Sequence, residues 1–175
     1  HPVEALQEAY NAGQRIFGES KVQEMTLKHE QLPTDIEWHF IGHLQTNKVK
    51  YIAPYVSLIH AVDSERLLAE IDKQASRIGR KIPCLLQLHI AREETKFGFT
   101  PDECISMLQD SAWRTLQNIE IRGVMCMASN TDDVEQVREE FAAVHRLFLE
   151  MKERFFNDGE NRFDIMSAGM SDDYP

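Results

Sequence analysis

The segment Cys84-Leu85-Leu86-Gln87-Leu88-His89-Ile90 decides the fold class. It is a short run too apolar to leave one face in water, which is typical of a strand buried on both faces of a parallel sheet. A helix start follows at Thr100-Pro101-Asp102-Glu103, where an N-cap threonine, a proline at the first helical position and a glutamate placed for a capping box coincide. A buried strand followed by a capped helix indicates an α/β protein.

The same alternation of strand and helix continues on both sides of this segment. Short apolar runs predict further strands at 15–18, 38–42, 58–62, 119–127 and 163–167. Amphipathic helices are expected between nearly all of them, at 3–10, 21–31, 47–52, 64–78 and 134–151. No Asn-Gly dipeptide joins two neighbouring strands as a hairpin. Parallel strands with helical crossovers are therefore expected.

Two architectures satisfy this pattern, an open doubly wound sheet and a closed eightfold barrel. The chain opens at His1 on a helix without a methionine and closes at 171–175 on what resembles a helix start, so both ends look cut. A (β/α)8 TIM barrel usually takes about 250 residues, and a chain of 175 residues holding six strands is in proportion to that. We predict a barrel fragment with about six of eight strands, the first and last being missing, and a single truncated domain over 1–175.

Composition restricts the partners. The formal net charge is −10, from 29 acidic and 19 basic residues, which disfavours nucleic acid and anionic membrane surfaces. No apolar run approaches the ~20 residues that span a bilayer. Cys84, Cys104 and Cys126 are widely spaced and form no Cys-x-x-Cys pair, which favours buried thiols in a reducing cytoplasm. Walker and Gly-x-Gly-x-x-Gly loops are absent, as is a Ser-His-Asp order.

Functional groups of a barrel project from the C-terminal ends of its strands. The candidates there are Glu19, Ser20, His43, Gln45, Asp63, His89, Met127 and the stretch Ser167-Ala168-Gly169-Met170-Ser171. That last stretch combines hydroxyls, small residues and backbone N–H groups before a predicted helix, which suits an anion. With one strand assumed before His1, it follows strand seven, where barrels often bind phosphate. A plain strand-to-helix turn is the alternative, and both interpretations stay open at this point.

The histidines give little support for a metal. His39 and His43 lie four residues apart, or ~13 Å along an extended strand, too far to share one zinc ion without a break in the strand. Packed or hydrogen-bonded histidines are favoured, and Asp63 is interpreted as a helix-start carboxylate. For His89, ligand contact and plain packing stay open. The run 92–96 is interpreted as a solvated loop anchored by Phe97-Gly98-Phe99.

The stretch Trp38-His39-Phe40-Ile41-Gly42-His43-Leu44-Gln45-Thr46-Asn47-Lys48 resembles the signature of the pyridoxal phosphate homeostasis proteins, once called proline synthetase co-transcribed homologues. Further matches follow in the same order at 17–19, 22–24, 57–63, 93–99, 121–125 and 169–175, so that the resemblance covers essentially the whole chain. It implies a single-domain barrel like the N-terminal domain of alanine racemase, with pyridoxal 5'-phosphate bound at the C-terminal mouth.

The resemblance also implies the cofactor contacts. Ser167 matches the family's phosphate-binding serine, with backbone help from Ala168 and Gly169. The remaining contacts implied are Ser20, Ile41 and Met125, the latter two lining the ring pocket. Ala168 stands where methionine is usual and Ser20 where asparagine is usual, so their side-chain contacts depart from the family pattern.

No catalytic residue is assigned within the chain. The family's Schiff-base lysine would lie just before His1, and Lys21, Lys48 and Lys96 are interpreted as surface or loop residues rather than substitutes. A later family strand is also missing; its arginine faces the pyridine nitrogen and disfavours ring protonation, which limits carbanion chemistry.

The resulting hypothesis is a monomeric, cytoplasmic protein that holds pyridoxal phosphate and delivers it to apo-enzymes without robust turnover. The alternatives are a pyridoxal-phosphate-dependent amino-acid racemase or lyase of the alanine racemase type, and a cofactor-free barrel that acts through protein partners.

Overall fold

Strands and helices alternate along the chain in a computed structural model that describes residues 1–90, 97–129 and 131–170. The strands are β1 (Ile16–Glu19), β2 (Glu37–Phe40), β3 (Val56–Val62), β4 (Ile82–Leu88), β5 (Ile119–Ala128) and β6 (Ile165–Met170). The α-helices are α1 (Val3–Asn11), α2 (Val22–Gln31), α3 (Val49–Ile52), α4 (Glu65–Arg77), α5 (Pro101–Gln109) and α6 (Val134–Phe155), and the 3-10 helices are η1 (Thr46–Lys48) and η2 (Ser111–Thr115).

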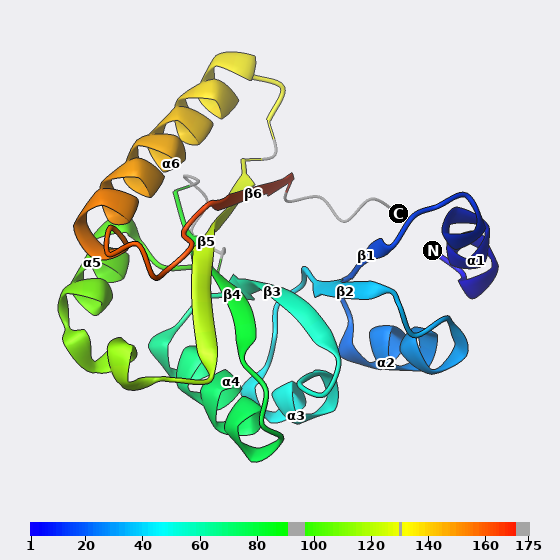
Figure 1. The fold of residues 1–175 in the computed structure, drawn as a ribbon. Coiled ribbons are helices and arrows are strands. Elements are labelled where there is room, and N and C mark those ends of the chain that lie inside the picture. Colours follow the sequence, from blue (N-terminus) through cyan, green and yellow to red (C-terminus); the bar gives the residue numbers. More distant parts are fainter. Residues whose placement is uncertain (91–96, 130, 171–175) are drawn as a thin grey trace.

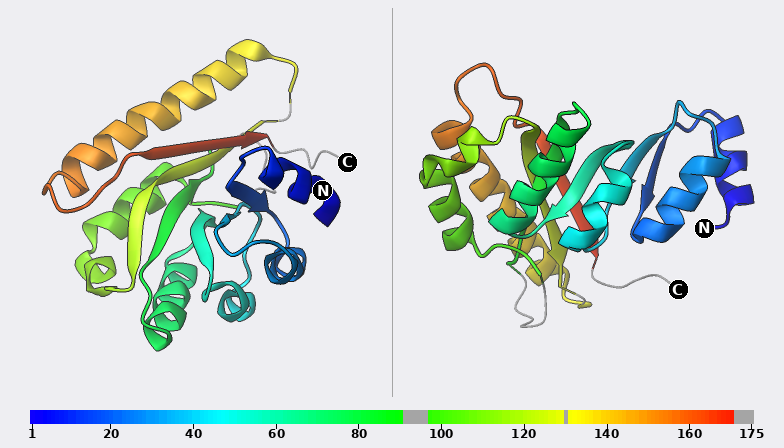
Figure 2. Two further views of the ribbon diagram at one scale, coloured as in Figure 1. Left: turned by 45° about the vertical axis from the view of Figure 1, so that its right-hand side comes forward. Right: turned by 90° about the horizontal axis from the view of Figure 1, so that it is seen from below.

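The described strands form a single parallel sheet in the order β1-β2-β3-β4-β5-β6 (Figure 1). Helices α2 to α6 lie on the outside of the curved sheet (Figure 2). A doubly wound sheet would instead reverse its strand order and carry helices on both faces. The barrel prediction is therefore confirmed, as a six-stranded portion of a barrel wall.

Apolar side chains form two separate clusters, one on each face of the sheet. The larger cluster lies between strands and helices, and it includes Trp38 and Phe40 of β2, each 1% exposed, and Ile71 of α4. The smaller cluster consists of strand residues alone: Leu58, Ala61, Leu85 and Met125, with Met127 and Ile165 packed against them. Because the helices cover the outer face, this second cluster lies on the inner face, which we call the concave face.

The curl of the sheet has two local causes in the described strands. The pairing register shifts between β2 and β3, between β3 and β4, and between β4 and β5, and such irregularities increase twist and bend. Gly123 then allows β6 to approach β5 closely, because a Cβ at this position would overlap the backbone carbonyl of Ile165. Together these features turn β6 back toward the concave face of β2 and β3.

Most helices begin where the sequence predicts them to begin. The hydroxyl of Ser64 accepts a hydrogen bond from the Leu67 amide, and Thr100 forms a complete capping box with Glu103. The region 47–52 is helical as predicted, and it consists of a turn of 3-10 helix followed by four α-helical residues. Residues 91–96, and with them the predicted solvated loop, lie outside the described part of the chain.

The prediction of a glycine turn after residue 167 is wrong. Strand β6 continues to Met170, so that Ser167, Ala168 and Gly169 are strand residues, aligned with Met125, Cys126 and Met127 of β5. The physical reason is the length of β5, which runs ten residues to Ala128 and offers β6 backbone partners beyond the predicted strand end. Ser171, the last residue of the predicted anion loop, lies outside the described residues.

Candidate functional site on the concave face

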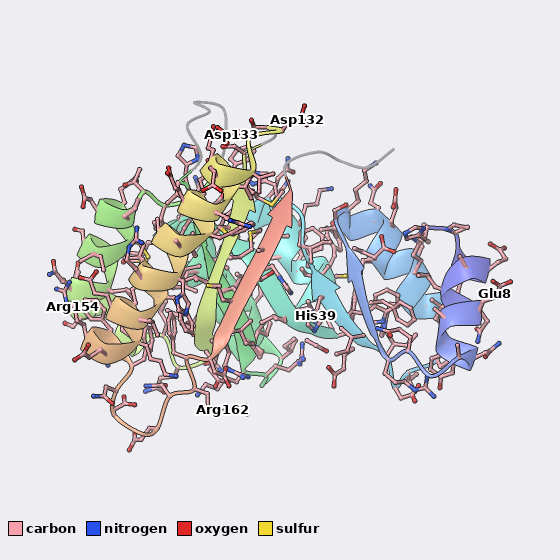
Figure 3. All side chains as sticks on the ribbon, turned by 90° about the horizontal axis from the view of Figure 1, so that it is seen from above. Glu8, His39, Asp132, Asp133, Arg154 and Arg162 are labelled. Atoms are coloured by element: carbon pink, nitrogen blue, oxygen red, sulfur yellow. The ribbon has the colours of Figure 1, made fainter. Side chains whose placement is uncertain are left out.

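Three polar side chains meet on the concave face, two from the neighbouring strands β2 and β3 and one from β6, which pairs with neither. The Nδ1 atom of His39, on β2, lies 3.0 Å from Nε2 of His60, on β3. His39 is labelled in Figure 3. The other ring nitrogen of His60, Nδ1, lies 2.9 Å from Oγ of Ser167, on β6. Since β4 and β5 separate β3 from β6 within the sheet, only the curl of the sheet allows this contact. We call these three residues the His-His-Ser cluster.

Strand alternation explains why His39 and Ser167 face inward. Trp38 and Phe40 point to the helices, so His39 between them points to the concave face. Ser167 is the register partner of Met125, a member of the concave cluster, and side chains of aligned parallel residues share a face. The His-His-Ser cluster therefore lies beside the smaller apolar cluster on the concave face.

Burial keeps both imidazoles uncharged near neutral pH. Loss of solvent, with a smaller repulsion from His39, lowers the pKa of His60 to about 4. Loss of solvent also lowers the pKa of His39, against a partial opposing attraction from the carboxylate of Glu37. A neutral imidazole has one N–H donor and one acceptor nitrogen, so each of these rings can donate one hydrogen bond and accept one.

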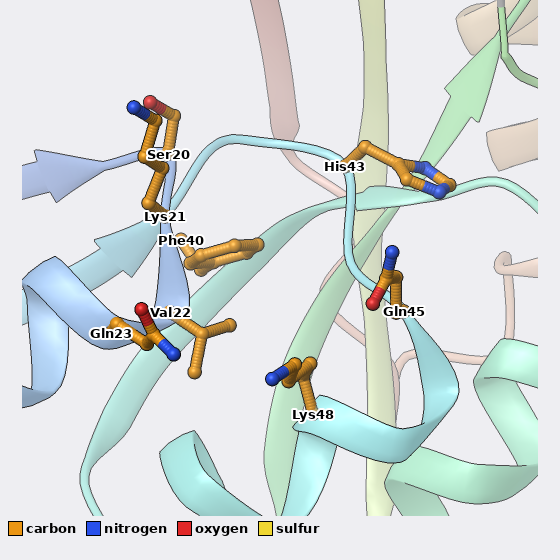
Figure 4. A pocket seen from close by; sticks show the side chains of 8 residues that line it. All are labelled: Ser20, Lys21, Val22, Gln23, Phe40, His43, Gln45 and Lys48. Carbon is orange, nitrogen blue, oxygen red and sulfur yellow. The ribbon is translucent and has the colours of Figure 1, made fainter.

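A pocket of about 340 Å³ opens beside this face, at the C-terminal ends of β1 and β2 (Figure 4). Its lining consists of Ser20, Lys21, Val22, Gln23, Phe40, His43, Gln45 and Lys48. The Lys48 side chain extends from η1 toward Gln23 and Val22, while His43 turns away from the others (Figure 4). The pocket is thus polar and cationic at its rim and apolar at Phe40 and Val22.

The predicted surface character of Lys21 is confirmed, since its side chain is 74% exposed and lies 3.7 Å from Glu24. Lys48 is half-buried in the pocket wall. In the described part of the chain every lysine lies on a helix or loop and none on a strand. The described strands therefore offer no amine to a ligand on the concave face, and the position of the Schiff-base lysine stays a prediction.

His43, outside the cluster, is paired and stacked, in agreement with the prediction of a packed histidine. Nδ1 of His43 lies 3.2 Å from Asp63, and its ring stacks on Phe97 with centroids 3.9 Å apart. Asp63 therefore contacts a histidine, and the N-cap of α4 is Ser64. In the segments that the structure describes, no three His, Cys, Asp or Glu residues are grouped to hold a metal ion.

The structure brings two of the predicted contact residues together and places the others around them. Ser167 and Met125 are aligned neighbours on the concave face. Ile41 follows β2 and lies against Gly18, whose absent side chain leaves it room. Ser20 follows β1, and its carbonyl lies so close to Gly42 that a Cβ there would overlap it. These positions agree with a ligand spanning from β1 to β6, and the contacts themselves stay predictions.

Ala168 differs from the other predicted contact residues in the face of the sheet that its side chain occupies. Its register partner, Cys126, belongs to the outer cluster, so the Ala168 side chain lies on the face opposite to that of Ser167. Only its backbone remains available to a ligand on the concave face. Gly169 is aligned with Met127, and its predicted role is likewise one for the backbone.

His60 is the residue that sequence reasoning missed. A signal was present, because His60 is a polar residue inside the apolar strand run 58–62, where a solvated side chain is not expected. The identity of its partner carried no signal, since Ser167 is 107 residues away along the chain.

The donor set fits a flat, phosphorylated ligand. Hydroxyl and N–H groups at Ser167 and the two histidines suit an anionic group, and Met125 with Leu58 and Leu85 offers apolar contact to a ring. Such a layout, on the inner face of a curled parallel sheet with outer helices, defines an α/β barrel protein with a candidate ligand site on its concave face.

Comparison with known proteins agrees with this assignment. The family model for the alanine racemase N-terminal domain matches residues 1–174. The pyridoxal phosphate homeostasis protein of Helicobacter pylori is 35% identical over 175 residues, covering 98% of this chain and 73% of that protein. The chain belongs to the pyridoxal phosphate homeostasis protein family.

Comparison with solved structures agrees with this family assignment. PipY of Synechococcus elongatus, solved without pyridoxal phosphate, aligns with a TM-score of 0.88 and 33% identity over 98% of this chain and 78% of that chain. The same protein with pyridoxal phosphate bound aligns with a TM-score of 0.84 and 34% identity over 100% and 80%. Alanine racemase of Clostridium difficile aligns with a TM-score of 0.73 over 97% and 44%, and at 15% identity it shows the shared fold alone.

Proposed function

We propose that this chain binds pyridoxal 5'-phosphate on its concave face and holds the cofactor for other proteins without turning over a substrate. The observation that carries the proposal is the position of the Ser167 hydroxyl, half-buried on the concave face next to Met125 and within hydrogen-bond distance of His60. The relative solved with pyridoxal phosphate bound, at 34% identity over the whole chain, supports the choice of ligand.

In this proposal each contact has a distinct role. Bound pyridoxal phosphate supplies an aldehyde and an electron-accepting ring. The Ser167 hydroxyl donates to the phosphate, and the backbone of Ala168 and Gly169 adds support along β6. Met125 and Ile41 contact the ring and exclude water from it. Ser20 borders the site at the end of β1.

A binding experiment tests the proposal. Isothermal titration should show that the protein binds pyridoxal phosphate more tightly than pyridoxal, which lacks the phosphate. Ser167→Ala should weaken binding of pyridoxal phosphate by about 10- to 100-fold, because a hydrogen bond to a charged acceptor contributes about 1.5–3 kcal/mol. The control is Ser76→Ala on the exposed side of α4. Equal binding of both ligands by the unmodified protein, or no effect of Ser167→Ala, would contradict the proposal.

An enzyme of the racemase type is the second candidate, and the shared fold with alanine racemase is the observation that favours it. The names of the more similar relatives, which are homeostasis proteins, support the holding role instead. We expect no racemisation of free amino acids by the loaded protein. Turnover within the usual enzyme range of about 1–10³ s⁻¹ would favour the enzyme.

The setting of the function is also part of the proposal. We expect a cytoplasmic monomer that releases pyridoxal phosphate to apo-enzymes. Support comes from Cys84, Cys104 and Cys126, which are all free and buried, as suits a reducing compartment. None of the described helices is long and apolar enough to span a membrane. Activation of an apo-enzyme by the loaded protein, in the presence of a scavenger for free cofactor, is the measurement that checks delivery.

A further inference from the structure

We propose that His60 positions the Ser167 hydroxyl for the phosphate group of the ligand, through a relay of hydrogen bonds that begins at His39. The inference rests on the proposed function, because it takes the concave face as the place where the phosphorylated ligand binds. His60 acts in this proposal through Ser167 and is a positioning residue. It extends the predicted contacts, which contain no histidine.

The geometry gives His60 a partner at each ring nitrogen. Nδ1 faces Ser167 Oγ at 2.9 Å and Nε2 faces His39 Nδ1 at 3.0 Å, both within ordinary hydrogen-bond range. The rings of His39 and His60 are tilted by 48° with centroids 5.1 Å apart, so the contact runs through ring nitrogens and is not a stack. The position of one proton in this cluster therefore fixes the positions of the others.

A neutral His60 allows two arrangements of these protons. In the first, the Ser167 hydroxyl donates to Nδ1 of His60, and Nε2–H of His60 donates to His39. In the second, Nδ1 of His39 donates to Nε2 of His60, and Nδ1–H of His60 donates to the oxygen of Ser167. The serine proton points at the histidine in the first arrangement and is free to point elsewhere in the second.

A phosphate group selects the second arrangement. Phosphate oxygens of an ionised ligand accept hydrogen bonds, so the serine must turn its proton toward them. His60 then satisfies the serine oxygen by donating from Nδ1, and His39 must supply the proton that Nε2 of His60 accepts. The titratable groups that act on this relay are the Glu37 carboxylate, which acts on His39, and the two histidines. Burial keeps both rings uncharged, as the relay requires.

The relay predicts a specific pattern of binding. His60→Phe removes both ring nitrogens and keeps a flat ring, and it should weaken pyridoxal phosphate binding by roughly three- to tenfold, the value of one neutral hydrogen bond. Affinity for pyridoxal, which has no phosphate, should stay unchanged. His60→Gln, whose amide can still donate to Ser167, should recover most of the loss. The control is His145→Phe on the exposed side of α6, which should change neither affinity.

Combining the variants tests the connection to Ser167. Because His60 acts through the serine, adding His60→Phe to Ser167→Ala should weaken binding little beyond Ser167→Ala alone. A merely structural role for His60 would instead lower the affinity for pyridoxal as well, and its effect would add to that of Ser167→Ala. Either of those results would overturn the relay.

A measurement on the unmodified protein covers the case in which a variant fails to fold. Nitrogen-15 NMR of the imidazole rings distinguishes a protonated from an unprotonated ring nitrogen. On addition of pyridoxal phosphate, Nδ1 of His60 should become the protonated nitrogen. Unchanged ring nitrogens with an unprotonated Nδ1, despite saturating ligand, would overturn the relay.

The outcomes separate this inference from the proposed function. If Ser167→Ala weakens binding while His60→Phe binds as the unmodified protein does, the relay is wrong and the concave-face site stands. If neither variant weakens binding of pyridoxal phosphate, both the relay and the site are wrong.

Discussion

One residue separates the proposed ligand contact from a solvent-exposed side chain on β6. Ser167 faces inward with Met125, whereas the next residue, Ala168, is aligned with Cys126 of the outer cluster. Strand alternation alone makes this difference, and a register slip of one residue would exchange the two positions. The type of side chain at position 168 should therefore have little effect on the concave face, although residue 168 is next to Ser167 in the sequence.

Replacing Ala168 tests this alternation. Ala168→Met, which restores the residue usual in the resembling family, should leave the affinity for pyridoxal phosphate within about twofold, because the new side chain extends into solvent on the outer face. Titration calorimetry is the measurement, with Ser167→Ala as the sensitive comparison. A several-fold change in affinity would mean that position 168 faces the ligand.

The end segments of β1 and β2 approach each other at Gly42. A Cβ at this position would overlap the carbonyl oxygen of Ser20, whereas the nearest atom to a Cβ at Gly18 would be in the Ile41 side chain, at an ordinary contact distance of 3.4 Å. Gly42→Ala should therefore lower the free energy of unfolding by about 1–3 kcal/mol, the usual cost of overpacking. Gly18→Ala is the matched control and should cost clearly less. Urea unfolding measures both, and equal costs would refute the close approach.

Among the elements, α2 is joined to β1 by a buried ion pair. Nζ of Lys28 lies 2.6 Å from Oε1 of Glu19, and both side chains are only 9% exposed. A buried charge that has lost its partner destabilises the folded state far more than the intact ion pair stabilises it. The two residues therefore act as one unit in the attachment of the helix to the sheet.

Single and double replacements should differ in stability. Lys28→Met leaves the Glu19 carboxylate buried without its lysine and should lower the free energy of unfolding by about 3–5 kcal/mol. The double variant Lys28→Met with Glu19→Leu should recover most of that loss. Arg154→Met breaks the exposed pair with Glu150 on α6 and should cost less than about 1 kcal/mol. If the losses of unfolding free energy from the two replacements add in the double variant, Glu19 and Lys28 do not act as one unit.

The order and type of the elements could be predicted from the sequence, because apolar runs and caps act locally. The run at 84–90 and the capping box at Thr100 each predicted their element to within a few residues. The end of β6 could not be predicted, since it depends on the length of β5. Nor could the contact between His60 and Ser167, because it depends on curvature and register shifts that no short segment determines.

For the whole molecule, the buried histidines make stability depend on pH. The pKa of His60 is about 4 in the folded protein, against an ordinary value of 6.5. Between these values the unfolded chain binds a proton that the folded chain does not, so stability falls as pH falls. The His60 contribution is fully present above about pH 6.5, and about 3 kcal/mol is lost once the pH is below 4. The pKa of His39 is lowered too, and acts in the same direction.

A comparison with His60→Phe isolates this effect. From pH 7.5 to pH 4.5, the unmodified protein should lose more unfolding free energy than the variant, whose residue 60 does not titrate. Urea unfolding at several pH values gives both curves, and carboxylates elsewhere contribute to each alike. Parallel curves would show that His60 does not bind a proton differently in the two states.

The consecutive strand order affects the stage of folding at which the proposed binding site can form. Each strand of the described sheet aligns with its neighbour in sequence, so successive strand–helix units can form in turn from the first. The link between His60 and Ser167 spans 107 residues and exists only after β6 has docked. A chain folded only as far as β5 would lack this link, so on the proposed function cofactor uptake would report that β6 is in place.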